Sequence, residues 1–268
     1  DFLSNLVSKR NVAPSTQRQA LNALVFFYRE VLNMPVKGEM MPIRSKKKVH
    51  PPTVLTKEEV QGMFLKLKGT HLLMAKLLYG AGLRLMECIR LRIQDVDFGK
   101  NKIYIRGGKG GKDRLSVLPQ NIRDELRFHI YQVIVQHQED LLEGFGEVYL
   151  PHELDRKYPN AARETGWQYV FPAKKRSIDP RSDREMRHHV LETGLQKAVK
   201  RAVTQSGIHK KAVCHTLRHS FAAHMLENGI NIRVLQTLMG HADVKTTEIY
   251  THVMKKDIDA IQSPLDQL

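Results

Sequence analysis

Three short strand-like segments interrupt an otherwise mostly helical pattern. Residues 93–98, 102–105 and 114–117 alternate apolar and polar side chains, which is typical of half-buried strands. Gly99–Asn101 and the glycine-rich Gly107–Gly111 supply the turns between them. The segments before and after them mostly repeat apolar side chains with the helical period. We therefore expect a mainly α-helical fold with one small three-stranded antiparallel sheet, an α+β arrangement.

The helical segments divide into a short first part and a longer second part. Residues 1–40 contain two helical patterns, and residues 41–53 are rich in proline, lysine and methionine. Thr56 and Glu59 have the spacing of a capping box, which begins a helix at the start of residues 54–268. The sequence therefore predicts a small helical domain, a basic linker and a larger domain.

The overall charge indicates a polyanionic partner. Lysine and arginine total 43 against 28 aspartate and glutamate, a formal net charge of +15. No apolar run is long enough to span a membrane and no signal peptide is recognisable, so we expect no membrane association and a cytoplasmic location. Cys88 and Cys214 lie in apolar helical patterns, so we expect both to be buried and reduced.

A cluster of chemically active residues lies near the C-terminus. His215 and Arg218 are three residues apart, so they share one face of a helix, and His241 and Tyr250 follow on two further short helical segments. A tyrosine that attacks a phosphodiester needs cationic donors around the phosphate oxygens and an imidazole to move its proton. Arginine suits this role because its planar fork binds phosphate oxygens bidentately.

In its order and spacing, this set resembles the C-terminal signature of the tyrosine recombinases, the phage-integrase family. That family also has an arginine in a Gly-Leu-Arg turn, here Gly82 to Arg84, and a lysine on a β-hairpin, here Lys109. The resemblance implies cleavage through a 3′-phosphotyrosyl intermediate without metal or cofactor, and Lys109 as the acid that protonates the leaving 5′ oxygen; Lys112 is the competing candidate. The implied catalytic residues are Arg84, Lys109, His215, Arg218, His241 and Tyr250.

Structural alternatives exist for each residue taken singly. The spacing of His215 and His219 is compatible with zinc, but no acidic residue accompanies the first histidine and Arg218 would repel a cation. Tyr250 alone would most often be a core residue, and Arg84 alone a surface charge. It is the joint order and spacing that favour a catalytic site. Glu87, one turn after Arg84, is interpreted as a carboxylate that orients a basic side chain.

Residues 143–172 form an insertion rich in glycine, proline and aromatic residues. This insertion, with the Asp-Pro-Arg-Ser and Arg-His-His sequences after it, resembles the integron integrases. Those recombinases act on gene-cassette sites folded from a single strand, from which unpaired bases protrude. Stacking on aromatic and imidazole faces suits such bases, and the predicted contacts are Trp167, Pro180, His188 and His189. The alternatives are that Trp167 anchors a core and that the two histidines are solvated.

The resemblance also bears on assembly. Residues 1–40 are similar to part of the helical core-binding domain of these recombinases, and Lys46 and Lys47 in the linker are expected near DNA phosphates. Residues 255–268 form an apolar tail that such proteins exchange between subunits, which implies a homotetramer on two DNA sites; a frayed end is the alternative. Two other functions remain open: a recombinase of the Xer or phage type acting on duplex DNA, and a DNA-binding protein with an idle site.

Overall fold

The computed structural model describes residues 2–34, 52–107, 113–241 and 243–250. The chain separates into two compact units, Asp1–Pro51 and Pro52–Leu268. None of the helices in the described ranges combines the length and the apolar character needed to cross a membrane. The predicted contacts Lys46, Lys47, Lys109 and Lys112 and the tail at 255–268 lie outside the described residues.

Within residues 2–34, the first unit forms two helices. Helix α1 spans Phe2–Ser8 and α2 spans Pro14–Phe26, which continues as a π-helical turn over Phe27–Val31. The side-chain amide of Gln17 donates a hydrogen bond to the carbonyl of Leu3 (3.3 Å) and so joins the two helices. These two side chains are the buried ones among residues 2–34, as expected of so short a piece.

The second unit begins with three helices, α3 (Lys57–Phe64), α4 (Gly69–Gly80) and α5 (Leu85–Ile89). The predicted capping box is confirmed: Thr56 Oγ1 accepts from the Glu59 amide (3.2 Å), and Glu59 Oε2 accepts from the Thr56 amide (2.7 Å). Helix α4 is apolar on most sides and lies in the main core, where five of its side chains are buried.

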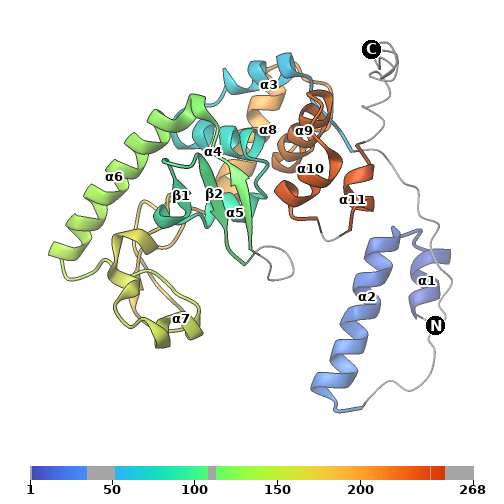
Figure 1. Cartoon of the computed structure of the whole chain (residues 1–268). Coiled ribbons are helices and arrows are strands. Elements are labelled where there is room, and N and C mark those ends of the chain that lie inside the picture. The colour runs from blue at the N-terminus through green and yellow to red at the C-terminus, as the bar shows by residue number, and fades with distance from the viewer. Residues whose placement is uncertain (1, 35–51, 108–112, 242, 251–268) are drawn as a thin grey trace, which may run out of the picture. The chain divides into compact units, whose positions relative to one another are not determined.

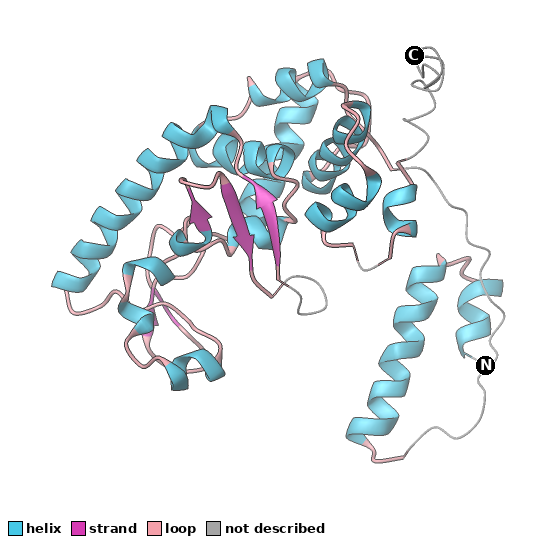
Figure 2. Cartoon of the chain, in the orientation of Figure 1, coloured by secondary structure: helices cyan, strands magenta, loops and turns pink. Residues whose placement is uncertain are grey.

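The predicted sheet is confirmed as an antiparallel sheet of three strands in the order β1-β2-β3 (Figure 2). Its strands are β1 (Val96–Asp97), β2 (Lys102–Ile105) and β3 (Arg114–Val117). The first strand is shorter than predicted because Ile93–Asp95 forms a 3₁₀ turn. Asp95 causes this turn, since its carboxylate accepts from the backbone amide of Arg92 (3.3 Å) and closes the chain on itself.

A long helix leads from the sheet into the insertion. A 3₁₀ turn at Gln120–Ile122 precedes α6 (Arg123–Leu142). The following elements are all short: α7 (His152–Lys157), 3₁₀ turns at Ala161–Arg163 and Thr165–Trp167, and a two-stranded sheet of β4 (Ser177–Ile178) and β5 (Glu185–Met186). This second sheet was not predicted. Ion pairs stabilise the region, with both Arg176 and Arg187 bonded to the carboxylate of Asp140.

Toward the end of the described residues lie helices α8 (Glu192–Gln205), α9 (Cys214–Glu227), α10 (Ile232–Met239) and α11 (Lys245–Glu248). In Figure 1, α9, α10 and α11 lie side by side, and α9 packs against α4. Tyr250 was predicted to lie within the last helix but lies two residues beyond its end. Cys88 and Cys214 are buried and free, as predicted.

Candidate active site

A glycine turn places Arg84 at the start of α5. Gly82 has a positive φ of 60°, and a Cβ atom here would lie 2.4 Å from the ring of Phe221, so the turn requires glycine. Arg84 follows as the N-cap residue. Its backbone amide donates to Glu87 Oε2 (2.8 Å), and its Nη1 donates to Glu87 Oε1 (2.7 Å). Nη2 of Arg84 also donates to the carbonyl of Gly240 (3.1 Å).

Glu87 is shared by two arginines. Besides Arg84, it binds Nη1 and Nη2 of Arg114, each at 2.7 Å. Burial alone would raise the pKa of Glu87, but the hydrogen bonds and charges of Arg114 and Arg84 lower it to about 2. The carboxylate therefore stays ionised and fixes both guanidinium groups. The interpretation of Glu87 as an orienting carboxylate agrees with these contacts.

Arg114 was missed by the sequence analysis. On β3 it faces inward together with Ser116, whereas Leu115 between them is 44% exposed. The polar residues face inward because they have partners there: Ser116 Oγ donates to the carbonyl of Ala81 (2.6 Å), and Arg114 Nε donates to the carbonyl of Leu238 (2.9 Å). Arg114 thus joins the sheet to Glu87 and to the end of α10.

Arg218 lies at the centre of the site and is 1% exposed. Its Nη1 donates to the carbonyl of Gly82 and its Nη2 to the carbonyl of Met239. Nη2 also lies 3.4 Å from Nε2 of His241. Burial and the nearby charge of Arg84 lower the pKa of Arg218 to about 9, so it remains a cation at neutral pH.

His241 follows directly after α10. Gly240 ends that helix in the left-handed conformation, which turns His241 toward the arginines. Nδ1 of His241 pairs with Oγ1 of Thr247 at 2.9 Å. Burial and the charges of Arg218 and Arg84 lower the pKa of His241 to about 4, so its imidazole is neutral at physiological pH.

Tyr250 is 1% exposed, and its hydroxyl hydrogen-bonds to Nδ1 of His219. Burial raises the pKa of this phenol to about 12, against the opposing charge of Arg218. His215, the first histidine of the signature, is exposed one turn earlier on α9. The available signal for His219 was its four-residue spacing from His215, which was considered only as a zinc pattern.

A cavity of about 930 Å³ extends from this site to the insertion. Arg84 and Glu87 line it, as do all four predicted base contacts, namely Trp167, Pro180, His188 and His189. Trp167 is only partly buried, and it packs against the small apolar cluster of Leu150, Ala161 and Ala162. Trp167 therefore does both things: it packs against a small apolar cluster and it lines the cavity.

Arg92 and Arg181 line this cavity together with the aromatic side chains of Tyr149, Trp167 and Tyr169. Nη1 of Arg92 donates to the carbonyl of Trp167 (2.6 Å) and Nη2 to that of Tyr149 (2.8 Å). The Arg92 guanidinium also lies over the ring of Tyr169, 3.8 Å from its centroid. Nε2 of His188 lies 3.2 Å from Oδ2 of the buried Asp179. The hydrogen bonds and the ring contact of Arg92 fix this side of the cavity, which we call the base-contact wall and which includes Trp167, Pro180, His188 and His189.

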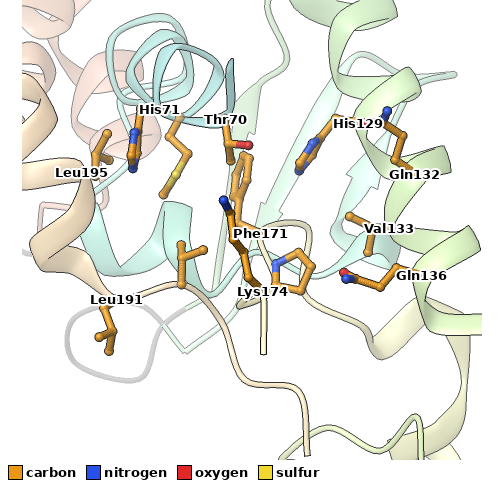
Figure 3. Close-up of a pocket in the computed structure, with 13 residues that line it drawn as sticks. Thr70, His71, His129, Gln132, Val133, Gln136, Phe171, Lys174, Leu191 and Leu195 are labelled. Atoms are coloured by element: carbon orange, nitrogen blue, oxygen red, sulfur yellow. The ribbon is translucent and has the colours of Figure 1, made fainter. Parts of the chain in front are cut away.

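A second cavity, of about 500 Å³, lies elsewhere in the unit (Figure 3). Side chains of α6, including His129 and Gln136, face Leu191 and Leu195 across it. None of the predicted catalytic or base-contact residues lines it.

A phage integrase family model matches residues 53–257, and a model for the N-terminal SAM-like domain of phage integrases matches residues 1–38. The chain belongs to the phage integrase family. An Escherichia coli integrase/recombinase is 45% identical over 100% of this chain and 79% of its own length. The tyrosine recombinase XerA of Pyrococcus furiosus is 35% identical over 77% of this chain and 59% of its own length.

Among solved structures, the Tn1549 transposon integrase in complex with transposon right end DNA covers 97% of this chain and 83% of its own, with a TM-score of 0.60. At 14% identity, this match shows a shared fold. The family match and the 45% and 35% identical relatives show that the chain is a site-specific tyrosine recombinase of the Xer/integrase type, a DNA recombination enzyme whose partner is DNA.

For a tyrosine recombinase, the site concentrates cations and one phenol in a small volume. Arg84, Arg218 and Arg114 converge around a single carboxylate, which leaves a net positive charge for a phosphate. Within the described ranges, no group of three or more His, Cys, Asp or Glu side chains is placed to hold a metal ion. The structure brings together five of the six predicted catalytic residues, and Lys109 lies outside the described part.

Proposed function

We propose that Tyr250 cleaves DNA by attacking the scissile phosphate, forming a 3′-phosphotyrosyl enzyme and releasing a 5′ hydroxyl. Arg84 and Arg218 bind the non-bridging oxygens, where negative charge grows in the transition state. His215 and His241 complete the set of donors. Lys109 protonates the departing 5′ oxygen, as the family resemblance implies. Attack by a 5′ hydroxyl of the partner strand then reverses the step and joins the exchanged strands.

The proposed substrates are gene-cassette sites of the integron type, folded from a single strand with protruding bases. The observation that carries this proposal is the shared cavity: Arg84 and the four base-contact residues, Trp167, Pro180, His188 and His189, line the same space. A base inserted there would lie against an aromatic ring and imidazole faces while the phosphate engages the arginines. Stacking of this kind contributes about 1–3 kcal/mol per base.

The net charge of +15 supports an extended contact with the DNA backbone. We propose that residues 1–40 are a partial core-binding domain, and that Lys46 and Lys47 in the linker at 41–53 and Lys112 in the hairpin contact phosphates. The functional assembly is a homotetramer on two sites, linked by exchange of the tail at 255–268. Removing the residues after Met254 should then weaken the assembled complex on gels while leaving binding of one protomer unchanged.

A covalent-adduct assay tests the proposed substrate. The protein is incubated without metal with a nicked, folded single-strand cassette site and, separately, with the matching linear duplex. We expect a denaturation-resistant adduct on the folded site that Tyr250→Phe abolishes, and far less adduct on the duplex. Equal adduct on both sites would favour a duplex recombinase of the XerA kind, the relative that is 35% identical. Salt-sensitive binding without adduct on either site would leave a DNA-binding protein.

A further inference from the structure

The Tyr250 hydroxyl contacts a histidine outside the recombinase signature. Its hydrogen bond is to Nδ1 of His219, and the two rings lie 5.7 Å apart between centroids. The His215 ring meets the His219 ring edge-on, with centroids 4.4 Å apart. Because His215 is exposed and Tyr250 is 1% exposed, His219 lies on the inner side of the histidine pair and His215 on the outer side.

We infer that His219 is a catalytic residue that accepts the Tyr250 proton during strand cleavage, while His215 is left to contact the phosphate. This inference rests on the proposed role of Tyr250 as nucleophile. The two histidines differ in position: the His219 ring contacts the phenol oxygen of Tyr250, whereas the His215 ring is exposed and can contact DNA.

The proton balance is simple. His219 is neutral, with its hydrogen on Nε2, so Nδ1 is free to accept the phenolic proton. As the bond from Tyr250 Oη to phosphorus forms, the Oη proton passes to Nδ1 and the bond from phosphorus to the 5′ oxygen breaks. The 5′ oxygen takes a proton from the general acid, Lys109 in the proposed mechanism. In the reverse step, His219 returns its proton to the departing phenol.

The electrostatics make this transfer dependent on bound DNA. Burial, the neighbouring His215 and the charge of Arg218 lower the pKa of His219 to about 4, and the phenol of Tyr250 has its pKa raised. In the free protein the proton therefore stays on the tyrosine. A phosphate between the arginines would supply a negative charge that favours the imidazolium form and makes His219 a stronger base. The groups that act on His219 directly are His215 and Arg218 on α9. Arg84 and Arg114 act with Arg218 on the neighbouring His241, and both are paired with Glu87.

Helix α9 also supplies a matched control. His224 is buried, and its Nδ1 pairs with the hydroxyl of Tyr79 at 2.8 Å. It therefore makes the same type of contact as His219, but with a tyrosine outside the site. A glutamine at either position removes the imidazole and retains a polar side chain. A purely structural role for His219 predicts similar effects from His219→Gln and His224→Gln.

The test is single-turnover adduct formation on nicked sites with two leaving groups. One site has the natural 5′ oxygen, and the other has a bridging sulfur, which leaves without needing a proton. We expect His219→Gln to slow adduct formation about 10²- to 10³-fold on both sites, within the range for loss of a general base, and His224→Gln to change it less than about threefold. If the sulfur site restored adduct formation by His219→Gln, His219 would protonate the leaving group and the inference would be overturned. An unchanged or faster rate of adduct formation by His219→Gln on the natural site would also overturn it.

A second measurement separates proton transfer from altered folding. Fluorotyrosine at position 250 has a lower phenol pKa and needs less help from a base. It should recover at least about tenfold of the activity lost in His219→Gln, whereas no recovery would contradict a proton-accepting role. Tyr250→Phe tests the underlying proposal separately: persistent adduct in that variant would place the nucleophile elsewhere and overturn the proposed function itself.

Discussion

The catalytic arginines and the arginines of the base-contact wall are held in different ways. Arg84 and Arg114 are bound by one carboxylate, Glu87, in a buried cluster formed by segments far apart in the sequence. In the wall, Arg92 is bound by backbone carbonyls and lies over an aromatic ring, and Arg181 lies over the ring of Tyr149, 4.3 Å from its centroid.

This difference has a functional consequence. The cluster around Glu87 contributes to folding and to binding of any phosphate, so its loss should affect every substrate. The wall lines the cavity, and its Trp167 packs only on a small apolar cluster outside the main core, so its loss should change which DNA is preferred.

Glu87→Gln should destabilise the second unit by about 3–5 kcal/mol, because it leaves buried guanidinium groups without their counter-charge. Adduct formation should fall on folded and duplex sites alike. Urea unfolding and the adduct assay measure both effects. Glu143→Gln is the control, since Glu143 also pairs with an arginine (Arg176, 2.7 Å) but its side chain is 59% exposed, so its loss should cost less than about 1 kcal/mol. Equal losses in the two variants would contradict the account.

Acid should weaken the cluster in two stages. The folded pKa of His241 and of His219 is about 4 against an ordinary 6.5, so the unfolded chain binds their protons first and stability declines as the pH falls from about 6.5 toward 4. Glu87 has a folded pKa of about 2 against 4.5, so its contribution of about 3 kcal/mol is present above pH 4.5 and is lost as the pH falls toward 2. Urea midpoints measured from pH 8 to 3 test both stages, and Glu87→Gln should remove the second.

Gly240→Ala should destabilise the site by about 2 kcal/mol. A Cβ here would lie 2.6 Å from Cδ of Arg114, and φ is 58°. Gly229→Ala is the matched control, because Gly229 also has a positive φ, 77°, but no atom lies within 4 Å of its Cβ position. It should show only the backbone cost of about 1 kcal/mol. Chemical denaturation distinguishes them, and equal values would mean that Arg114 moves aside freely.

Sequence reasoning predicted the parts of the site that depend on local signals. The capping box at Thr56, the turn that presents Arg84 and the face shared by His215 and Arg218 all follow from spacing within one or two helical turns. The order of the signature residues predicted membership of the tyrosine recombinase family. Two element boundaries were predicted wrongly: the first strand begins later than predicted, and α11 ends before Tyr250. Single contacts decide where such short elements begin and end, and sequence spacing does not reveal them.

The missed features depend on contacts that sequence spacing does not encode. Arg114 meets Glu87 across 27 positions, and Tyr250 meets His219 across 31. Arg114 and Ser116 face inward on β3, although apolar side chains are usually the buried ones. They do so because each has a buried hydrogen-bond partner, Glu87 for Arg114 and the carbonyl of Ala81 for Ser116. The available signal was that Arg114 and Ser116, two residues apart, lie on the same face of the strand. The joining of wall and catalytic site into one cavity is likewise a tertiary property.

The central claim is that an inserted base and the scissile phosphate occupy one cavity and that Trp167 contacts the base. The most direct test is a cycle between protein and DNA, combining Trp167→Leu with a folded site lacking its protruding bases. Affinity is measured for all four combinations. We predict that either change alone weakens binding about 5- to 150-fold, the equivalent of about 1–3 kcal/mol of stacking, and that the two together weaken it no further. Independent, multiplying losses would show that Trp167 and the protruding bases do not meet, and would contradict the account.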